Sequence, residues 1–287
     1  MIKNIFIAGA GQMGSGIAQV AAVSGYAVVL YDIKLAFAES GKAKITAALE
    51  KQVSKGRMEA AAAQDAIKRI TATEDIRQAA GCDLAIEAAT ENPEIKKKLF
   101  RDLDSNLPEH ALMATNTSSI SITELGAVTK RADKVVGMHF FNPAYVMKLV
   151  EVIKGVKTSD ETVSSVYELA KSFGKEPVVC KDSPGFIVNR LFDPMLNEAA
   201  FLVYEGIASP EDIDKAMMNG LNHPMGPIAL MDMIGIDVIL NVMEVLYAEF
   251  GDSKYRPCPL LRKMVAAGEL GKKSGKGFYD YTKQEHK

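Results

Sequence analysis

Short apolar runs alternate with longer amphipathic stretches through the first part of the chain. Runs rich in β-branched residues predict strands at 4–8, 27–31, 84–88, 112–115 and 134–138. The stretches between them predict helices at 13–24 and 93–103, and a helical pair across 35–70. One more helix, 161–173, and one more strand, 176–180, follow. This alternation is typical of βαβ units, so we expect an α/β fold with a Rossmann-type, mostly parallel sheet.

The pattern changes at Ser183-Pro184-Gly185, beyond which the sequence predicts only helices. Residues 186–204 form one amphipathic stretch. The run Ser-Pro-Glu-Asp at 209–212 starts another helix, with Ser as the cap, Pro at the first position and acids in the first turn. We therefore expect a Rossmann-like domain over 1–183 and an all-helical domain over 184–287.

A glycine-rich turn follows the first predicted strand and opens a helix. Three spaced glycines alone are a weak signal, but this context is typical of a dinucleotide-binding turn. In such a turn Gly9 permits the tight bend, Gly11 lets the backbone approach the pyrophosphate, and Gly14 lets helix and strand pack closely. The cofactor-binding residues predicted here are Gly9, Gly11, Gln12, Met13 and Gly14.

Asp32 lies 18 residues after Gly14, at the end of the next predicted strand. A carboxylate at this position accepts hydrogen bonds from the ribose hydroxyls of the adenosine and repels a 2′-phosphate. We therefore expect NAD as the cofactor. Lys34 lies close enough in the sequence to leave NADP open.

His139 and Glu151 are the one imidazole and the one carboxylate within an almost wholly apolar run, 137–153, that is typical of core β-structure. An unpartnered charge there would be costly. The economical explanation is that the two hold each other, the carboxylate fixing the imidazole tautomer so that the other nitrogen serves as a base. The alternative is a satisfied core histidine and a strand-end surface charge.

Further polar side chains follow the ends of predicted strands, where open α/β sheets bind ligands. Asn-Thr-Ser-Ser occupies 116–119, and Asn142-Pro143 comes shortly after His139. Asn189 stands near the start of the helical domain, from where we expect it to reach a cleft between the domains. These residue types donate and accept hydrogen bonds, as the positioning of a substrate oxygen requires.

Six motifs together resemble the 3-hydroxyacyl-CoA dehydrogenase family, and they cover the chain in the family's order. They are Gly-Ala-Gly-Gln-Met-Gly at 9–14, Asn-Thr-Ser-Ser at 116–119, His-Phe-Phe-Asn-Pro at 139–143, Lys-Leu-Val-Glu-Val at 148–152, Ser-Pro-Gly-Phe-Ile-Val-Asn-Arg at 183–190 and His-Pro-Met-Gly-Pro at 223–227. The resemblance implies NAD-dependent interconversion of a short-chain (S)-3-hydroxyacyl-CoA and its 3-ketoacyl-CoA. It also implies a homodimer formed through the helical domain. The direction of flux, fatty-acid oxidation or butyrate-type reduction, stays open.

The resemblance also implies roles for single residues. His139 resembles the family's general base and acid, and Glu151 its orienting partner; Ser118 and Asn189 resemble the residues that hold the 3-oxygen and the thioester region of the substrate. The residues that match cofactor contacts of the family are Asp32, Glu91, Lys96, Asn116, Ser118, Asn142 and Lys273.

Each of three assignments has a plain structural alternative. The alternative for Ser118 is a helix cap before Ile120, that for Asn189 is a place on a helix surface, and that for Lys273 is a solvated basic tail. Lys51 and Lys55 form part of a basic stretch that we expect to contact the phosphates of CoA. Their alternative is a solvated helix face, which is what alternating charge usually indicates.

Composition and charge exclude several classes of function. The 287 residues are 48% hydrophobic and 24% charged with a net charge of −2, so there is no broad basic surface for nucleic acid. Three cysteines, Cys82, Cys180 and Cys258, are far apart and have no CxxC spacing, which predicts neither a disulfide framework nor a metal site. They are compatible with a reducing cytosol.

The N-terminus runs directly into the glycine turn, so we expect no targeting peptide and a cytoplasmic location. The longest apolar stretch, 227–250, is interrupted by Asp232, Asp237 and Glu244, which argues against a membrane span.

Two other functions remain open from the residues alone. One is a β-hydroxyacid dehydrogenase that acts on a free acid, although such enzymes usually rely on a lysine of the helical domain. The other is a non-catalytic NAD-binding relative, which would be free to lose His139, Glu151, Ser118 and Asn189. A methyltransferase with a glycine-rich turn would not need the histidine and glutamate.

Overall fold

The structure is a computed structural model, and residues 2–282 of it are described here. The chain forms two compact units, with the boundary between Ser183 and Pro184. Each unit has its own hydrophobic core.

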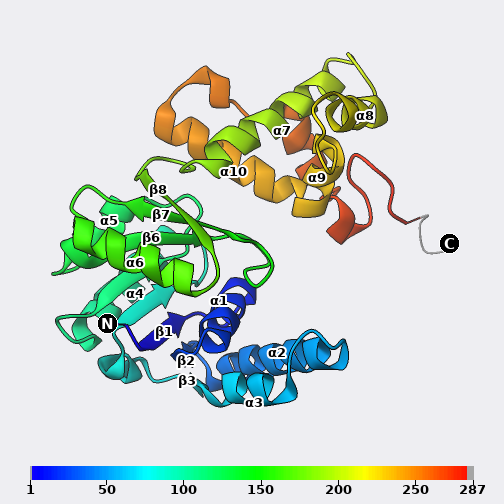
Figure 1. Cartoon of the computed structure of the whole chain (residues 1–287). Helices are drawn as coiled ribbons and strands as arrows, with labels where there is room; N and C mark the ends of the chain where they lie inside the picture. The colour runs from blue at the N-terminus through cyan, green and yellow to red at the C-terminus, as the bar shows by residue number, and fades with distance from the viewer. Residues whose placement is uncertain (1, 283–287) are drawn as a thin grey trace. The chain divides into compact units, whose positions relative to one another are not determined.

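The first unit is built on one eight-stranded sheet in the order β3-β2-β1-β4-β5-β6-β7-β8 (Figure 1). All neighbours are parallel except β6 and β7, which are antiparallel. The order of the first six strands is that of the dinucleotide-binding fold, with the direction of winding reversing between β1 and β4. The strands are β1 (Asn4–Ala8), β2 (Ala27–Tyr31), β3 (Ile70–Thr73), β4 (Leu84–Glu87), β5 (Leu112–Thr115), β6 (Val135–Phe140), β7 (Leu149–Lys154) and β8 (Glu176–Lys181).

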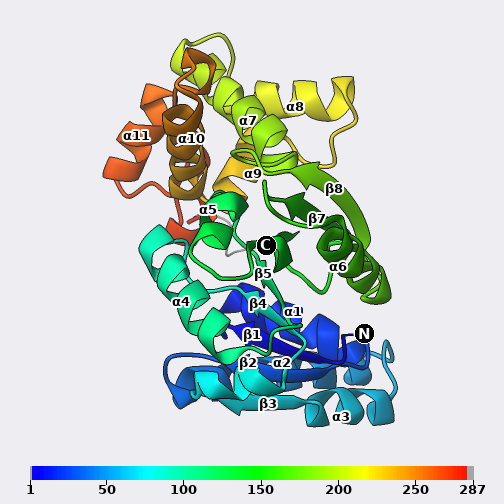
Figure 2. The ribbon, with the colours of Figure 1, turned by 90° about the vertical axis from the view of Figure 1, so that its left-hand side faces the viewer.

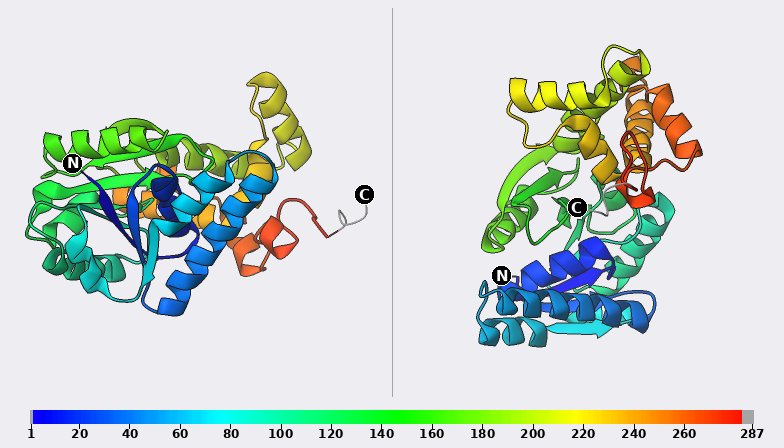
Figure 3. Two further views of the ribbon diagram at one scale, coloured as in Figure 1. Left: turned by 60° about the horizontal axis from the view of Figure 1, so that its bottom comes forward. Right: turned by 90° about the vertical axis from the view of Figure 1, so that its right-hand side faces the viewer.

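Helices cover both faces of this sheet. Helices α4 and α5 lie on one side of the strands and α6 on the other (Figure 2). Helices α2 and α3 lie side by side and pack with α1 against the β1–β3 part of the sheet (Figure 3). The helices of this unit are α1 (Gln12–Val23), α2 (Leu35–Ser54), α3 (Ala60–Lys68), α4 (Pro93–Asn106), α5 (Ile122–Ala127) and α6 (Asp160–Ser172), with 3₁₀ turns at Ile76–Gly81 and Ala132–Lys134.

The start of α4 is fixed by its sequence. The Asn92 side chain accepts hydrogen bonds from the backbone N–H of Glu94 at 3.0 Å and of Ile95 at 3.1 Å, and Pro93 takes the first helical position. Both choices satisfy or remove donors that a helix N-terminus leaves unpaired. This cap places Lys96 in the first turn of α4, facing the sheet, where it is buried.

The second unit consists of helices around a core of Leu, Ile and Met side chains. The Asn197 side chain joins α7 to the segment before α11: its Nδ2 donates to the carbonyl of Arg256 at 3.0 Å, and its Oδ1 accepts from the N–H of Cys258 at 2.8 Å. The helices are α7 (Val188–Tyr204), α8 (Pro210–Gly220), α9 (Pro227–Ile234), α10 (Ile236–Phe250) and α11 (Pro259–Ala266), with 3₁₀ turns at Ser253–Tyr255 and Lys272–Ser274.

Two buried carboxylates anchor the C-terminal segment of this unit. Asp232 accepts from the backbone N–H of Phe278 at 3.0 Å and of Tyr279 at 2.9 Å. Asp214 accepts from the hydroxyl of Tyr279 at 2.7 Å and from the N–H of Ile228 at 2.7 Å. The 3₁₀ turn that carries Lys273 is therefore part of the packed unit.

The predicted fold class is confirmed: a Rossmann-type, mostly parallel sheet is followed by helices. Three details differ. The helical pair predicted to reach residue 70 ends at Lys68, because Ile70–Thr73 pairs with β2 as a short edge strand. The strand predicted over 134–138 continues to Phe140, so it contains His139. The short helix α5 was not among the predicted helices and entered only as the alternative in which Ser118 is a helix cap.

Among the described residues, no helix combines the length and apolar character needed to cross a membrane.

Candidate active site

The predicted cofactor turn has the geometry that a dinucleotide requires. Gly9 has a φ of +113°, and a Cβ there would lie 2.6 Å from the carbonyl oxygen of Ala88. A Cβ on Gly14 would lie 1.8 Å from the carbonyl oxygen of Gly9, so helix α1 can pack this closely only without a side chain. Gly11 has nothing within 4 Å of its Cβ position. Gly9 and Gly14 thus leave no room for a side chain next to the protein, whereas the space at Gly11 is open to the pyrophosphate of a dinucleotide.

Asp32 follows β2 and holds this turn in place. Its Oδ2 accepts from the backbone N–H of Ala10 at 2.8 Å, and its Oδ1 accepts from its neighbour Ile33 at 2.8 Å. A carboxylate has further lone pairs for ribose hydroxyls. The residues therefore match an NAD site, with Asp32 serving both the turn and the expected ribose contact.

His139 and Glu151 are brought together as the sequence predicts. They face each other in the antiparallel register of β6 and β7, and Nδ1 of His139 lies 2.7 Å from Oε2 of Glu151. Only 6% of His139 and none of Glu151 is exposed. The alternative in which Glu151 is a surface charge is wrong, because the carboxylate is fully buried on the imidazole.

Asn116 and Asn142 lie at the same edge of the sheet, where β5 and β6 end. The side-chain oxygen of Asn116 accepts from the backbone N–H of Phe140 at 2.8 Å. The side-chain oxygen of Asn142 accepts from Nε2 of Gln12 at 3.0 Å, which links the loop after β6 to the first residue of α1. Met13, next to Gln12, is partly buried against the core of the first unit. The predicted cofactor residues of the first unit therefore lie together at the carboxyl ends of the sheet strands.

Ser118 is held by Glu91. Oε1 of Glu91 accepts from the backbone N–H of Ser118 at 2.7 Å, from its hydroxyl at 3.2 Å, and from the hydroxyl of Thr117 at 2.5 Å. The alternative role of Ser118 as a helix cap is wrong, since Thr117 accepts from the N–H of Ile120 and Ser121 caps α5.

Glu91 remains ionised despite partial burial. Burial alone would raise the pKa of its carboxyl group, but the ammonium of Lys96 and the hydrogen bonds from Thr117 and Ser118 outweigh that effect and lower it. Nζ of Lys96 lies 3.3 Å from Oε2 of Glu91. It also lies 2.7 and 2.8 Å from the two oxygens of Glu87. Lys96 is 1% exposed, so its direct contact with the cofactor stays a prediction while its contacts with the two carboxylates are established.

Asn189 and Lys273 belong to the second unit. Asn189 lies in the first turn of α7 and is partly buried, and the ammonium of Lys273 lies 2.7 Å from Oδ2 of Asp237. Lys273 is thus an exposed side chain that is paired with a carboxylate. Lys51 in the last turn of α2 and Lys55 just after it are both exposed. The roles assigned to these four residues stay predictions.

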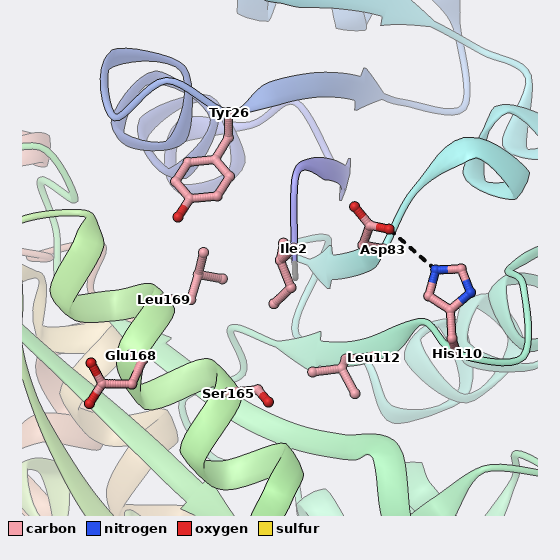
Figure 4. A pocket seen from close by; sticks show the side chains of 8 residues that line it. All are labelled: Ile2, Tyr26, Asp83, His110, Leu112, Ser165, Glu168 and Leu169. Atoms are coloured by element: carbon pink, nitrogen blue, oxygen red, sulfur yellow. Dashed lines mark hydrogen bonds and ion pairs between the residues drawn. The ribbon is translucent and has the colours of Figure 1, made fainter.

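At the amino ends of the sheet strands there is a hollow of about 380 Å³, and none of the predicted site residues lines it. Its lining comes from the amino ends of the strands and from α6 (Figure 4). Ile2, Leu112 and Leu169 provide apolar surface, and Asp83 and His110 are bonded to each other at one side of the hollow, at 3.2 Å. No group of three or more potential metal ligands was found within residues 2–282.

Comparison with known proteins agrees with this geometry. The NAD binding domain of the 3-hydroxyacyl-CoA dehydrogenase family matches residues 4–183, and the C-terminal domain of that family matches residues 185–281. The chain belongs to the 3-hydroxyacyl-CoA dehydrogenase family. The family and the NAD cofactor predicted from the sequence are thereby confirmed.

Named members of the 3-hydroxyacyl-CoA dehydrogenase family are similar to this chain along nearly their full length. A probable 3-hydroxybutyryl-CoA dehydrogenase of Bacillus subtilis is 52% identical over 283 residues, or 99% of each chain. The 3-hydroxybutyryl-CoA dehydrogenase of Clostridioides difficile is 49% identical, over 98% of this chain and 100% of that one. The crystal structure of (S)-3-hydroxybutyryl-CoA dehydrogenase from Ralstonia eutropha has a TM-score of 0.96 at 50% identity, over 99% of this chain and 100% of that one.

Sequence reasoning missed Glu87, although it singled out its partner Lys96 as a match to a cofactor contact. Glu87 ends the apolar strand Leu-Ala-Ile-Glu, and it is fully buried. The argument that singled out His139 and Glu151, a titratable side chain in an apolar strand, applies equally to it. That signal was present in the sequence.

Proposed function

We propose that this chain interconverts (S)-3-hydroxybutyryl-CoA and acetoacetyl-CoA with NAD as the redox partner. The observation that carries the proposal is the buried His139–Glu151 pair at the sheet edge that also carries the glycine turn. A base beside a nicotinamide site is what oxidation of a secondary alcohol needs. The named relatives at 49 to 52% identity support the substrate.

In the direction of oxidation, His139 removes the proton of the substrate hydroxyl. Nδ1 of the imidazole faces Glu151, so we assign proton transfer to Nε2. Proton removal makes the imidazole cationic, and the carboxylate of Glu151 stabilises that cation without a change of position. In the reverse direction the protonated His139 donates to the developing alkoxide. Bound NAD supplies the hydride acceptor.

Ser118 and Asn189 are assigned to the oxygen side of the substrate. Ser118 is fixed by Glu91 at the end of β5, one strand from His139. Once it turns from Glu91, the single O–H of Ser118 can donate a hydrogen bond to a 3-keto oxygen, and the side-chain amide of Asn189 can do the same. Fixed donors of this kind hold the reacting carbon in place and stabilise the charge on its oxygen.

The decisive experiment compares acetoacetyl-CoA with free acetoacetate as oxidants of NADH, followed by the loss of NADH absorbance. We expect turnover with the thioester and little with the free acid. Equal rates with the two substrates would contradict specificity for a CoA thioester and would favour a dehydrogenase that acts on free hydroxyacids. Absence of turnover with both, while NADH still binds, would favour a non-catalytic relative. NADPH in place of NADH tests the cofactor.

Lys51 and Lys55 are proposed to contact the phosphates of CoA, on the support of their exposure and charge. Reversal of both charges is expected to raise the KM for acetoacetyl-CoA and to leave the KM for NADH unchanged. Lys44, an exposed lysine earlier on α2, provides the matched control. Equal effects of the two changes, or none at Lys51 and Lys55, would remove the phosphate contact.

We also propose that the protein is a homodimer formed through the helical unit. Apolar side chains of that unit remain exposed in a single chain, among them Leu191 at 72%, Ile207 at 66% and Leu221 at 65%. Burial of such side chains between two subunits would remove apolar surface from water, which favours association. Light scattering after size exclusion is expected to give twice the 31.0 kDa of one chain. A mass of one chain would contradict the dimer.

A further inference from the structure

Glu87 is a buried carboxylate beside the proposed active site, at the carboxyl end of β4. Its oxygens accept four hydrogen bonds: two from Nζ of Lys96 at 2.7 and 2.8 Å, one from the hydroxyl of Thr115 at 2.7 Å, and one from the backbone N–H of Ala89 at 2.7 Å. Its side chain is fully buried. A carboxylate with this many donors is held in one position.

Glu87 faces the same side of the sheet as the proposed catalytic residue. The register pairs Glu87 with Thr115 and Thr115 with Gly137, two residues before His139 in β6. Side chains two apart on a strand share a face, so Glu87, Thr115 and His139 lie on one side. This face is the one covered by α4, whose Lys96 reaches down to Glu87.

Lys96 connects Glu87 to Glu91, and Glu91 connects to Ser118. The two ion pairs of Lys96 are unequal, 2.7 Å to Glu87 against 3.3 Å to Glu91. The ammonium of Lys96 is therefore attracted more strongly to Glu87 than to Glu91. Glu91 is left with Oε1 directed at the N–H of Ser118 and the hydroxyl of Thr117.

We propose that Glu87 is a positioning residue for Ser118, acting through Lys96 and Glu91. The inference rests on the proposed function, in which Ser118 holds the substrate oxygen. Without the charge of Glu87, the ammonium of Lys96 is drawn to its remaining carboxylate, Glu91. That movement pulls Glu91 away from the amide of Ser118. A displacement of the order of 1 Å at a group that holds the substrate is enough to cost about a hundredfold in rate.

The test compares Glu87→Gln in two backgrounds, wild type and Ser118→Ala. Gln preserves the shape of the side chain and removes its charge. We expect Glu87→Gln to lower kcat for acetoacetyl-CoA by about tenfold to hundredfold in the wild-type background. Where Ser118 is already Ala, the same change is expected to cost less than about twofold, because residues that act as a unit are not additive. An equal loss in both backgrounds would overturn the proposal.

Asp104→Asn is the matched control for loss of a buried ion pair. Asp104 lies on α4 and bonds Arg131 at 2.7 Å, with side chains 8% and 12% exposed. The control is expected to lower the thermal midpoint and to leave kcat unchanged. If it lowers kcat as much as Glu87→Gln does, the effect is structural and the inference fails. Should Glu87→Gln not fold, Glu87→Asp weakens the contact with Lys96 by shortening the side chain, and a smaller loss of kcat with the same dependence on Ser118 is expected.

Amide hydrogen exchange separates this inference from the proposed function. Residues 116–120 are expected to exchange faster in Glu87→Gln than in wild type, with no such change in Asp104→Asn. Absence of turnover in the wild type would overturn the proposed function, and the exchange would still decide whether Glu87 positions Ser118. Unchanged exchange in this segment would overturn the inference even in an active enzyme.

Discussion

Nδ1 of His139 lies 2.7 Å from Oε2 of Glu151, across a register pair of the two antiparallel strands in an otherwise parallel sheet. The backbone ladder therefore fixes the distance between base and carboxylate, and no loop has to order for them to meet. A buried carboxylate on one imidazole nitrogen sets the tautomer and stabilises the imidazolium that proton removal creates.

Glu151→Gln tests this pair. The amide can still bond Nδ1, but it no longer stabilises a cation and it favours the wrong tautomer. We expect kcat for acetoacetyl-CoA reduction to fall by about 10²–10⁴-fold, as for a triad carboxylate made neutral. NADH binding, measured by fluorescence, is expected to stay within about threefold of wild type, a change of less than 1 kcal/mol.

His139→Gln is the companion change and removes the base itself. It is expected to lose at least as much turnover, typically about 10²–10⁴-fold, and again to keep NADH binding. Because the two residues act as a unit, the double variant should be little worse than His139→Gln alone. Substantial activity in His139→Gln would rule out the assigned base.

The sequence predicted the His139–Glu151 pair because burial and charge conflict visibly there, and only mutual pairing resolves the conflict. The same conflict exists at Glu87 in β4, yet its partner Lys96 lies nine residues away on a helix that reads as an ordinary charged surface stretch. No regular spacing of residues in the sequence indicates that a strand residue will contact a lysine of the helix that covers the sheet. Discovery of this contact required the packing of α4 on the sheet.

The strand prediction failed at the short edge strand β3, and it came within one residue at the other edge strand, β8. β1 and β5 lie inside the sheet and their bounds match the predicted ranges, whereas the four-residue strand β3 at the edge was taken for the end of a helix. An edge strand has one neighbour and a partly exposed face, so its apolar signal is short. The helix cap at Ser121 was likewise hidden among several hydroxyl residues, any of which can cap.

Gly11→Ala and Gly14→Ala form a matched pair of tests of the cofactor turn. A methyl group on Gly11 meets no protein atom within 4 Å, so the variant is expected to keep its thermal midpoint and to bind NADH at least about tenfold more weakly, a loss of about 1.4 kcal/mol. A methyl group on Gly14 collides with the Gly9 carbonyl, and we expect a loss of about 1–3 kcal/mol in stability. Unweakened NADH binding in Gly11→Ala would contradict the placement of the cofactor.

Asp32→Asn tests the basis of cofactor choice. Removal of the negative charge removes repulsion of a 2′-phosphate, so the ratio of kcat/KM for NADH to that for NADPH is expected to fall by about tenfold, or 1.4 kcal/mol. The hydrogen bonds to Ala10 and Ile33 give the variant a second effect, a small loss of stability as one acceptor becomes a donor. Lys34→Gln is the control for the neighbouring positive charge and should shift the ratio toward NADH. An unchanged ratio in Asp32→Asn would mean that other residues set the preference.

Asp193 on α7 makes the stability of the helical unit depend on pH. It is 3% exposed, and burial raises the pKa of its carboxyl group from 3.8 to about 7. Between pH 4 and pH 7 the folded chain therefore binds a proton that the unfolded chain has lost, and stability decreases as pH rises through this window.

Asp193→Asn stays neutral at every pH. Its advantage over wild type in free energy of unfolding, measured by urea titration of the helical circular dichroism signal, is expected to grow from pH 4 to pH 8 by an amount on the order of a few kcal/mol. Glu198→Gln, which neutralises an exposed carboxylate on the same helix, should show no such growth. Parallel pH profiles for wild type and Asp193→Asn would show that Asp193 ionises in the folded protein as readily as in the unfolded chain.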